Sequence, residues 1–170
     1  SIVVIVALVA LAAPASAGTL TAEAVFDQLK DLAGTWQGMT EGEGEAAEAP
    51  SEVTHRIEVS AGGTVVMETM QPETDHEMIN MYHLDGDDLL LTHYCAGGNQ
   101  PRMKLDLAAS NDQKLVFDFV GGTNLDPSVD GHIHAAEIQM IDGDHMDSIW
   151  QGWSEGKHQG TMTFHLARID

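Results

Sequence analysis

The sequence predicts an all-β fold, an antiparallel up-and-down β-barrel of about ten strands that follows a short N-terminal helix. From Ser51 onward, apolar residues recur with a period of two, which is the pattern of half-buried strands. The alternating runs are separated by hairpin-length turns, and no long helical pattern interrupts them. Strands joined in this order favour a barrel over a two-sheet sandwich, whose Greek-key crossings need longer connections.

The individual elements follow from local patterns. Residues 21–32 are expected to form a short amphipathic helix, with Thr21 as its N-cap. The acidic, Gly- and Ala-rich residues 41–50 lack apolar periodicity and predict a loop. The alternation places strand centres near Thr35, Val53, Val65, Met81, Leu91, Leu105, Phe117, Ile138, Ile149 and Phe164.

One hairpin, residues 82–95, holds most of the chemically capable side chains. Asp85-Gly86 marks its turn, because glycine supplies the positive φ that a tight hairpin needs. Period-two counting places His93 and Cys95 inside the barrel and Tyr94 outside. With the opposite phase, His93 and Cys95 would be surface residues.

The N-terminal residues have the pattern of a secretory signal peptide. An apolar run of about a dozen residues, shorter than the ~20 that span a bilayer, leads to Ala15-Ser16-Ala17, a typical cleavage pattern. We therefore expect a periplasmic or secreted protein in which residues 1–17 are removed. Residues 18–170 are then long enough for a single barrel domain, with no membrane contact after cleavage.

Composition limits the partners. The chain has 27 acidic and 7 basic residues, and its formal net charge of −20 falls entirely after residue 17. Such a charge disfavours nucleic acids and anionic membranes as partners and is typical of a solvated surface; the expected partner, a small-molecule ligand, follows from the barrel lumen. Cys95 is the single cysteine, so it forms no internal disulfide and is a buried thiol, a ligand or a reactive group. The oligomeric state stays open.

The residues after the expected helix resemble a known motif. Gly34-Thr35-Trp36 resembles the G-x-W motif that opens the first strand of lipocalins and related calycin barrels, and Arg168 matches the second half of that pattern. The resemblance implies that the Trp plugs the closed end of a calycin-like barrel and that the basic residue packs across it. Residues 32–38 are also similar to the first strand of nitrobindin-type haem-binding barrels, which have ten strands. The long acidic tract departs from that pattern, and the resemblance does not identify which histidine here would correspond to the haem ligand.

Period-two counting also predicts the contents of the lumen. The expected apolar interior consists of Ile57, Met67, Leu91, Leu105, Phe117, Phe119, Ile138, Met140, Trp150, Phe164 and Leu166. Polar residues share this phase or lie in a loop at the barrel rim, where Arg102 is a candidate anchor for a carboxylate. The candidate ligand-binding residues are His55, His83, His93, Tyr94, Cys95, Asn99, Arg102, His134 and Trp150.

Three interpretations of the histidines remain open. Each imidazole is satisfied individually, or several anchor an organic ligand in an apolar lumen, or some bind a transition metal or haem. The metal candidates are His93 with Cys95 and His132 with His134, because each pair shares one strand face at a separation of about 7 Å. The sequence contains no dense metal-binding motif such as C-x-x-C or H-E-x-x-H.

We therefore predict that the lumen binds a small, largely apolar molecule, without catalysis. The first alternative is a haem or transition-metal barrel. The second is an enzyme that uses His93 and Cys95 together with Tyr94. An interaction module with a filled, dry barrel is the structural alternative.

Overall fold

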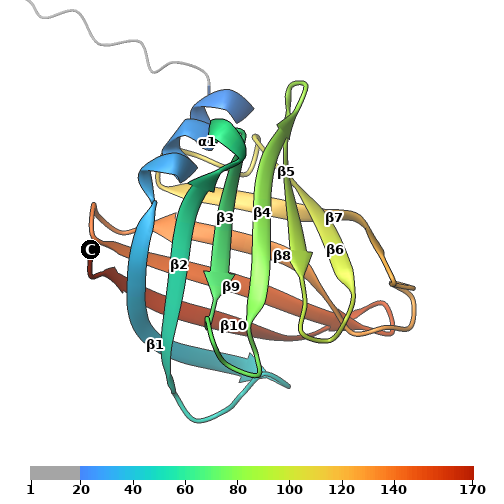
Figure 1. The fold of residues 1–170 in the computed structure, drawn as a ribbon. Coiled ribbons are helices and arrows are strands. Elements are labelled where there is room, and N and C mark those ends of the chain that lie inside the picture. Colours follow the sequence, from blue (N-terminus) through green and yellow to red (C-terminus); the bar gives the residue numbers. More distant parts are fainter. Residues whose placement is uncertain (1–19) are drawn as a thin grey trace, which may run out of the picture.

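The computed structural model describes residues 20–170 and shows a closed antiparallel barrel (Figure 1). The predicted signal peptide, residues 1–17, lies outside the described part. Each strand pairs with its sequence neighbours, and the first pairs with the tenth. The elements are α1 (Ala22–Asp31), β1 (Gly34–Gly44), β2 (Glu52–Ser60), the 3-10 turn η1 (Ala61–Gly63), β3 (Val65–Met70), β4 (Met78–Asp85), β5 (Asp88–Tyr94), β6 (Gln100–Leu105), β7 (Lys114–Thr123), β8 (His132–Met140), β9 (His145–Ser154) and β10 (Lys157–Arg168).

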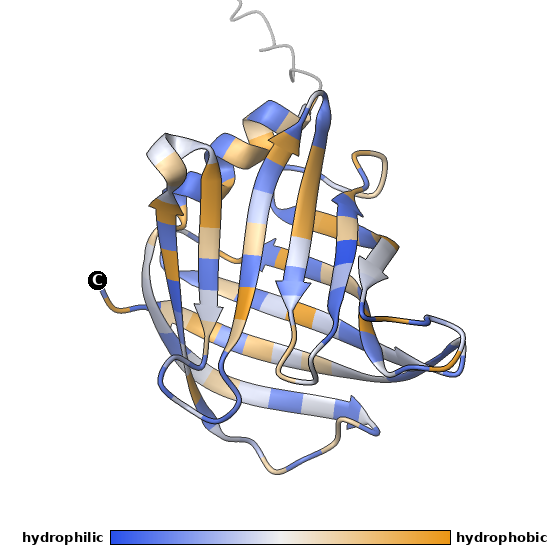
Figure 2. Cartoon of the chain, turned by 45° about the vertical axis from the view of Figure 1, so that its right-hand side comes forward, coloured by the Kyte–Doolittle hydropathy of each residue, from blue (hydrophilic) through white to orange (hydrophobic). Residues whose placement is uncertain are grey.

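The predicted fold class is confirmed, and so is the helix. The Thr21 side chain accepts a hydrogen bond from the Ala24 backbone N–H at 3.2 Å and caps α1. The apolar face of α1 is buried against one end of the barrel (Figure 1). Along the strands, hydrophobic and hydrophilic residues alternate, as period-two counting requires (Figure 2). Within residues 20–170, no helix is long and apolar enough to cross a bilayer.

Trp36 closes the barrel beneath α1. Its side chain is 0% exposed, and its Nε1–H donates to the Leu32 carbonyl at 2.9 Å. The Arg168 guanidinium lies 4.4 Å from the centroid of the Trp36 ring and donates to the carbonyls of Asp31 and Ala33. The contact that the G-x-W resemblance implies is therefore present, and it joins the last strand to the C-terminal end of α1.

The expected loop at residues 41–50 is only partly correct. Residues 41–44 continue β1 and pair with β10, from Glu41 opposite Thr163 to Gly44 opposite Gly160. Backbone hydrogen bonds hold this extension, so it needs no apolar alternation. The turn to β2 begins after Gly44.

The phase of β3 also differs from the prediction. Val66, Glu68 and Met70 are buried, whereas Met67 is only half-buried. Met67 was expected inside because it is apolar, but pairing with β2 and β4 decides the phase and buries a glutamate. Phe119 and Met140 are likewise half-buried. The other predicted interior residues are buried: Ile57, Leu91, Leu105, Phe117, Ile138, Trp150, Phe164 and Leu166.

His165 links three strands on the outer surface. Its Nδ1 lies 2.8 Å from Asp147 Oδ1 on β9, and its Nε2 lies 3.0 Å from Glu41 Oε2 on β1. The hydrogen bonds to Asp147 and Glu41 raise the pKa of His165 above its ordinary value. A pKa raised by folding stabilises the protein below the unfolded pKa, and this stabilisation is lost as the pH rises through the folded pKa.

We expect His165→Gln to lower the free energy of unfolding at pH 6 and to leave it unchanged at pH 9. The loss at pH 6 should be about 0.5 kcal/mol, because solvent screens a half-exposed ion pair. Urea denaturation at the two pH values measures it. Equal destabilisation at both values would contradict an electrostatic role for His165.

Candidate functional site

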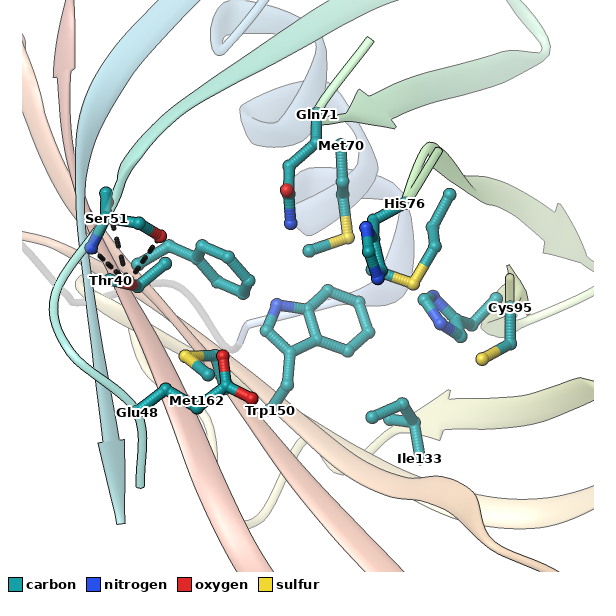
Figure 3. Close-up of a pocket in the computed structure, with 13 residues that line it drawn as sticks. Thr40, Glu48, Ser51, Met70, Gln71, His76, Cys95, Ile133, Trp150 and Met162 are labelled. Atoms are coloured by element: carbon teal, nitrogen blue, oxygen red, sulfur yellow. Dashed lines mark hydrogen bonds between the residues drawn. The ribbon is translucent and has the colours of Figure 1, made fainter. Parts of the chain in front are cut away.

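A cavity of about 380 Å³ lies at the end of the barrel opposite α1. It is bounded by the far end of β1 and by the connections that follow β1, β3 and β5 (Figure 3). Its apolar lining is Met70, Met78, Ile133, Trp150, Met162 and Phe164, and its polar lining is Thr40, Glu48, Ser51, Gln71, His76, His93 and Cys95. Glu48 and His76 are exposed, which marks this end as the entrance.

Trp150 forms much of one wall (Figure 3). Its Nε1–H donates to Ser148 Oγ at 2.8 Å, so the indole presents carbon atoms to the cavity with its polar atom already satisfied. The imidazole of His93 lies beside it, with ring centroids 5.2 Å apart. The wall therefore combines a large apolar surface with one imidazole.

Behind this wall, Glu68 is the centre of a buried hydrogen-bond network. Glu68 Oε1 accepts from His55 Nδ1 at 2.8 Å, and Oε2 accepts from Asn80 Nδ2 at 2.8 Å and from the Tyr82 hydroxyl at 3.0 Å. His93 Nδ1 lies 2.7 Å from Asn80 Oδ1. The register produces this arrangement, because Glu68 stands opposite Asn80 and Asn80 stands opposite His93 on successive strands.

The network keeps the Glu68 carboxylate ionised in the protein interior. Burial raises the pKa of Glu68, but the hydrogen bond and charge of His55 and the hydrogen bonds from Asn80 and Tyr82 outweigh it, so the pKa lies below its usual value. Burial, and next the Glu68 charge, raise the pKa of Tyr82 well above its usual value. Tyr82 is therefore a hydroxyl donor and Glu68 a pure acceptor.

These bonds fix the tautomer of His93. Since the Asn80 amide nitrogen faces Glu68, its oxygen faces His93 and accepts from Nδ1–H. Burial lowers the pKa of His93 to about 4, an effect that the Glu68 charge only partly offsets, so the ring is neutral near pH 7. Its Nε2 consequently carries a lone pair. This atom is buried, has no hydrogen-bond partner, and belongs to a residue that lines the cavity.

The structure brings together some of the predicted site residues. His93, Cys95 and Trp150 line the cavity, and His55 belongs to the network behind it. Tyr94 is 47% exposed, as its predicted outward phase requires. The other candidates do not line the cavity: His83, Asn99, Arg102 and His134.

Two of these residues lie at the rim. Asn99 Nδ2 donates to the Gly131 carbonyl at 2.8 Å and so joins the connection after β5 to the start of β8. Arg102 is exposed on β6. Neither side chain reaches the cavity lining.

His132 and His134 form a separate aromatic cluster. His132 Nε2 lies 3.0 Å from His134 Nδ1, and the His134 ring stacks between Phe119 and Trp153 at centroid distances of 4.7 and 4.1 Å. Burial, followed by the neighbouring His132, lowers the pKa of His134. A β-bulge between Ile133 and Ala135 disturbs the alternation, and Ile133 is the residue that lines the cavity. Among residues 20–170, no group of three or more His, Cys, Asp or Glu side chains could hold a metal ion.

Sequence reasoning missed Glu68, Asn80 and Tyr82. Met81 and Tyr82 lie on opposite faces of β4 and both are plausible core residues, so the local pattern leaves the phase of this strand, and with it the placement of Asn80, undecided. Glu68 gave no such signal, because an acidic residue in an alternating strand is usually on the solvent side. The network depends on the pairing of four strands, which no local pattern specifies.

Comparison with known proteins adds information about the fold only. No family model matches the chain, and no curated protein matches it significantly. A solved structure of a protein of unknown function from the DUF3598 family of Nostoc punctiforme is similar, with a TM-score of 0.57 and 13% sequence identity. The match covers 84% of this chain but 49% of that protein, so this chain spans about half its length.

Proposed function

We propose that the protein binds a small, largely apolar molecule in the open end of its barrel and does not convert it. The observation that carries this proposal is the cavity of about 380 Å³, lined by six apolar and seven polar residues, with a lining surface that is mostly apolar. Small-molecule sites have this composition and volumes of about 300 to 1,000 Å³. A barrel filled by its own side chains would leave no such space.

The haem or metal alternative has one supporting observation. A metal-bound histidine donates the N–H of one ring nitrogen to a neighbour and binds the metal through the other. His93 has this arrangement, because its Nδ1–H donates to Asn80 and its Nε2 has no partner among the described residues. A structural zinc site needs four ligands and a catalytic one three, more than the described residues bring together. Haem needs one axial imidazole, which His93 could supply. The cavity volume of about 380 Å³ lies near the lower end of the range for ligand pockets and favours a ligand smaller than haem.

The geometry gives less support to an enzyme that uses His93 and Cys95. A nucleophilic cysteine needs a base within hydrogen-bond distance. In the part of the chain that the structure describes, the hydrogen-bond partner of Cys95 Sγ is the Gly97 backbone N–H at 3.3 Å, and no hydrogen bond joins Cys95 to His93. Binding therefore accounts for the cavity better than catalysis does.

We further propose that the protein acts in the periplasm or outside the cell, with a small molecule as its partner. The support is the signal-peptide pattern of residues 1–17. The net charge of −20 disfavours nucleic acid as a partner and is consistent with a small molecule. A calycin-like ligand carrier is the finer description that the G-x-W resemblance and the Trp36–Arg168 contact support.

We expect purified protein to bind the neutral fluorescent probe N-phenyl-1-naphthylamine saturably, at one site per chain. Ile133→Phe adds bulk to the cavity wall and should weaken binding at least about ten-fold, because overpacking removes the space for the probe. Met162→Phe repeats the test from β10 in case the first variant misfolds. Probe fluorescence and quenching of the tryptophan fluorescence measure the dissociation constant.

Val120→Phe is the matched control, because Val120 is 55% exposed and does not line the cavity. It should bind the probe as the unmodified protein does. Affinity that is the same in all four proteins would refute binding in the cavity. A Soret band of stoichiometric haem in the purified protein would replace the proposal with the haem alternative.

A further inference from the structure

We infer that the ligand carries an uncharged hydrogen-bond donor, a hydroxyl or an N–H group, which binds Nε2 of His93. The inference rests on the proposed function and names the chemical class of its ligand. It follows from three features of the cavity: the direction of the hydrogen bonds behind His93, the state of the other polar groups, and the local charge.

The direction of the hydrogen bonds makes Nε2 an acceptor. The carboxylate of Glu68 can only accept, so the Asn80 amide nitrogen must face it and the Asn80 oxygen must face His93. His93 Nδ1 then carries the hydrogen, and Nε2 keeps its lone pair. A ligand carbonyl or ether oxygen would place two lone pairs against each other, whereas a donor would complete the network.

Nε2 of His93 is also a buried polar atom that has no hydrogen-bond partner in the described part of the chain and belongs to a residue of the cavity lining. Among residues 20–170, four buried side-chain polar atoms have no hydrogen-bond partner: His55 Nε2, His93 Nε2, Asn99 Oδ1 and Trp153 Nε1. Of these four residues, only His93 lines the cavity. Thr40 is the other buried polar residue of the lining, and its hydroxyl accepts from the Ser51 backbone N–H at 2.9 Å and pairs with the Ser51 hydroxyl. An unpaired buried acceptor is unfavourable, so a ligand that satisfies it gains affinity over one that does not.

The charge around the cavity argues against an anionic ligand. No lysine or arginine lines the cavity, whereas Glu48 does. The ring of His93 is neutral, since burial holds its pKa near 4. A carboxylate head would therefore lose its hydration without finding a cation, and the donor is a neutral group on an apolar body.

The test compares three ligands that share one ring system: 1-naphthol, 1-methoxynaphthalene and 1-naphthoate. We expect naphthol to bind about ten-fold more tightly than its methyl ether, the effect of about one neutral hydrogen bond. Naphthoate should bind more weakly than either. In His93→Phe, naphthol and its methyl ether should bind with about equal affinity. His93→Leu provides a second variant if the first fails to fold.

The matched control is His83→Phe, the same exchange on β4 at a residue outside the cavity lining, which should keep the ten-fold preference. Nitrogen NMR of the His93 imidazole gives a second readout: Nε2 should show the shift of an unprotonated ring nitrogen, and naphthol should move it. Titration by Trp fluorescence or calorimetry gives the affinities.

The outcomes separate this inference from the proposed function. If naphthol and its ether bind equally, or if His93→Phe keeps the preference, the donor inference is wrong and the binding cavity stands. Tighter binding of naphthoate would also overturn the inference. If no naphthalene binds saturably, the proposed function itself fails.

Discussion

Glu68→Ala is expected to lower the free energy of unfolding by about 3 to 5 kcal/mol at pH 7, the range for removing one partner of a buried charged network. The substitution leaves three buried donors without an acceptor: His55 Nδ1–H, Asn80 Nδ2–H and the Tyr82 hydroxyl. It also opens a hole in the middle of the barrel. Urea denaturation followed by circular dichroism measures the loss.

Glu58→Ala is the control for this prediction, because Glu58 is an exposed glutamate on the adjacent strand β2. It should change stability by about 0.5 kcal/mol or less. Glu68→Gln should fall between the two variants, since the amide oxygen still accepts hydrogen bonds but the charge is lost. Similar stabilities of Glu68→Ala and Glu58→Ala would show that the network does not hold the barrel together.

His93 is expected to make the protein less stable in mild acid. Folding lowers its pKa from 6.5 to about 4, so between these values the unfolded chain binds the extra proton and the folded protein does not. The contribution is complete above pH 6.5 and is lost as the pH falls toward 4. At about 1.36 kcal/mol per pKa unit, the stability lost relative to neutral pH is about 2 kcal/mol at pH 5 and about 3 kcal/mol at pH 4.

The comparison with His93→Gln isolates this contribution from all other titrating groups. Glutamine can still donate to Asn80 but does not titrate, so the stability difference between the two proteins should shrink by about 2 kcal/mol from pH 7 to pH 5. Leu91→Val, on the same strand, should lower stability by about 1 kcal/mol equally at both pH values. A difference that stays constant for His93→Gln would contradict a buried neutral imidazole.

Both predictions concern a polar network inside a barrel that could have been filled with apolar side chains. Such networks are favourable only when every member is satisfied. All five polar residues are joined by hydrogen bonds here, and two of their ring nitrogens, Nε2 of His55 and Nε2 of His93, have no partner among the described residues. Of these two residues, His93 lines the cavity. The network therefore stabilises the barrel interior and fixes His93 Nε2 as an acceptor on a residue of the cavity lining.

The sequence by itself determined much of the architecture. Alternation and turn residues predicted the strands and their order, and Thr21 predicted the start of α1. The inward phase of His93 and Cys95 was also correct, because Leu89 and Leu91 share the face of His93, whereas Leu90 is the single leucine on the opposite face. These features depend on neighbours a few residues apart in the chain.

Only the tertiary structure decided which residues meet. Glu68, Asn80 and His93 lie on three strands, and their contact depends on a register that a shift of one residue would abolish. The bulge in β8 likewise placed Ile133 in the cavity wall, while His134 stacks in a separate cluster. Local patterns specify strands, whereas the pairing of strands is settled by closure of the whole barrel, and the candidate site depends on that pairing.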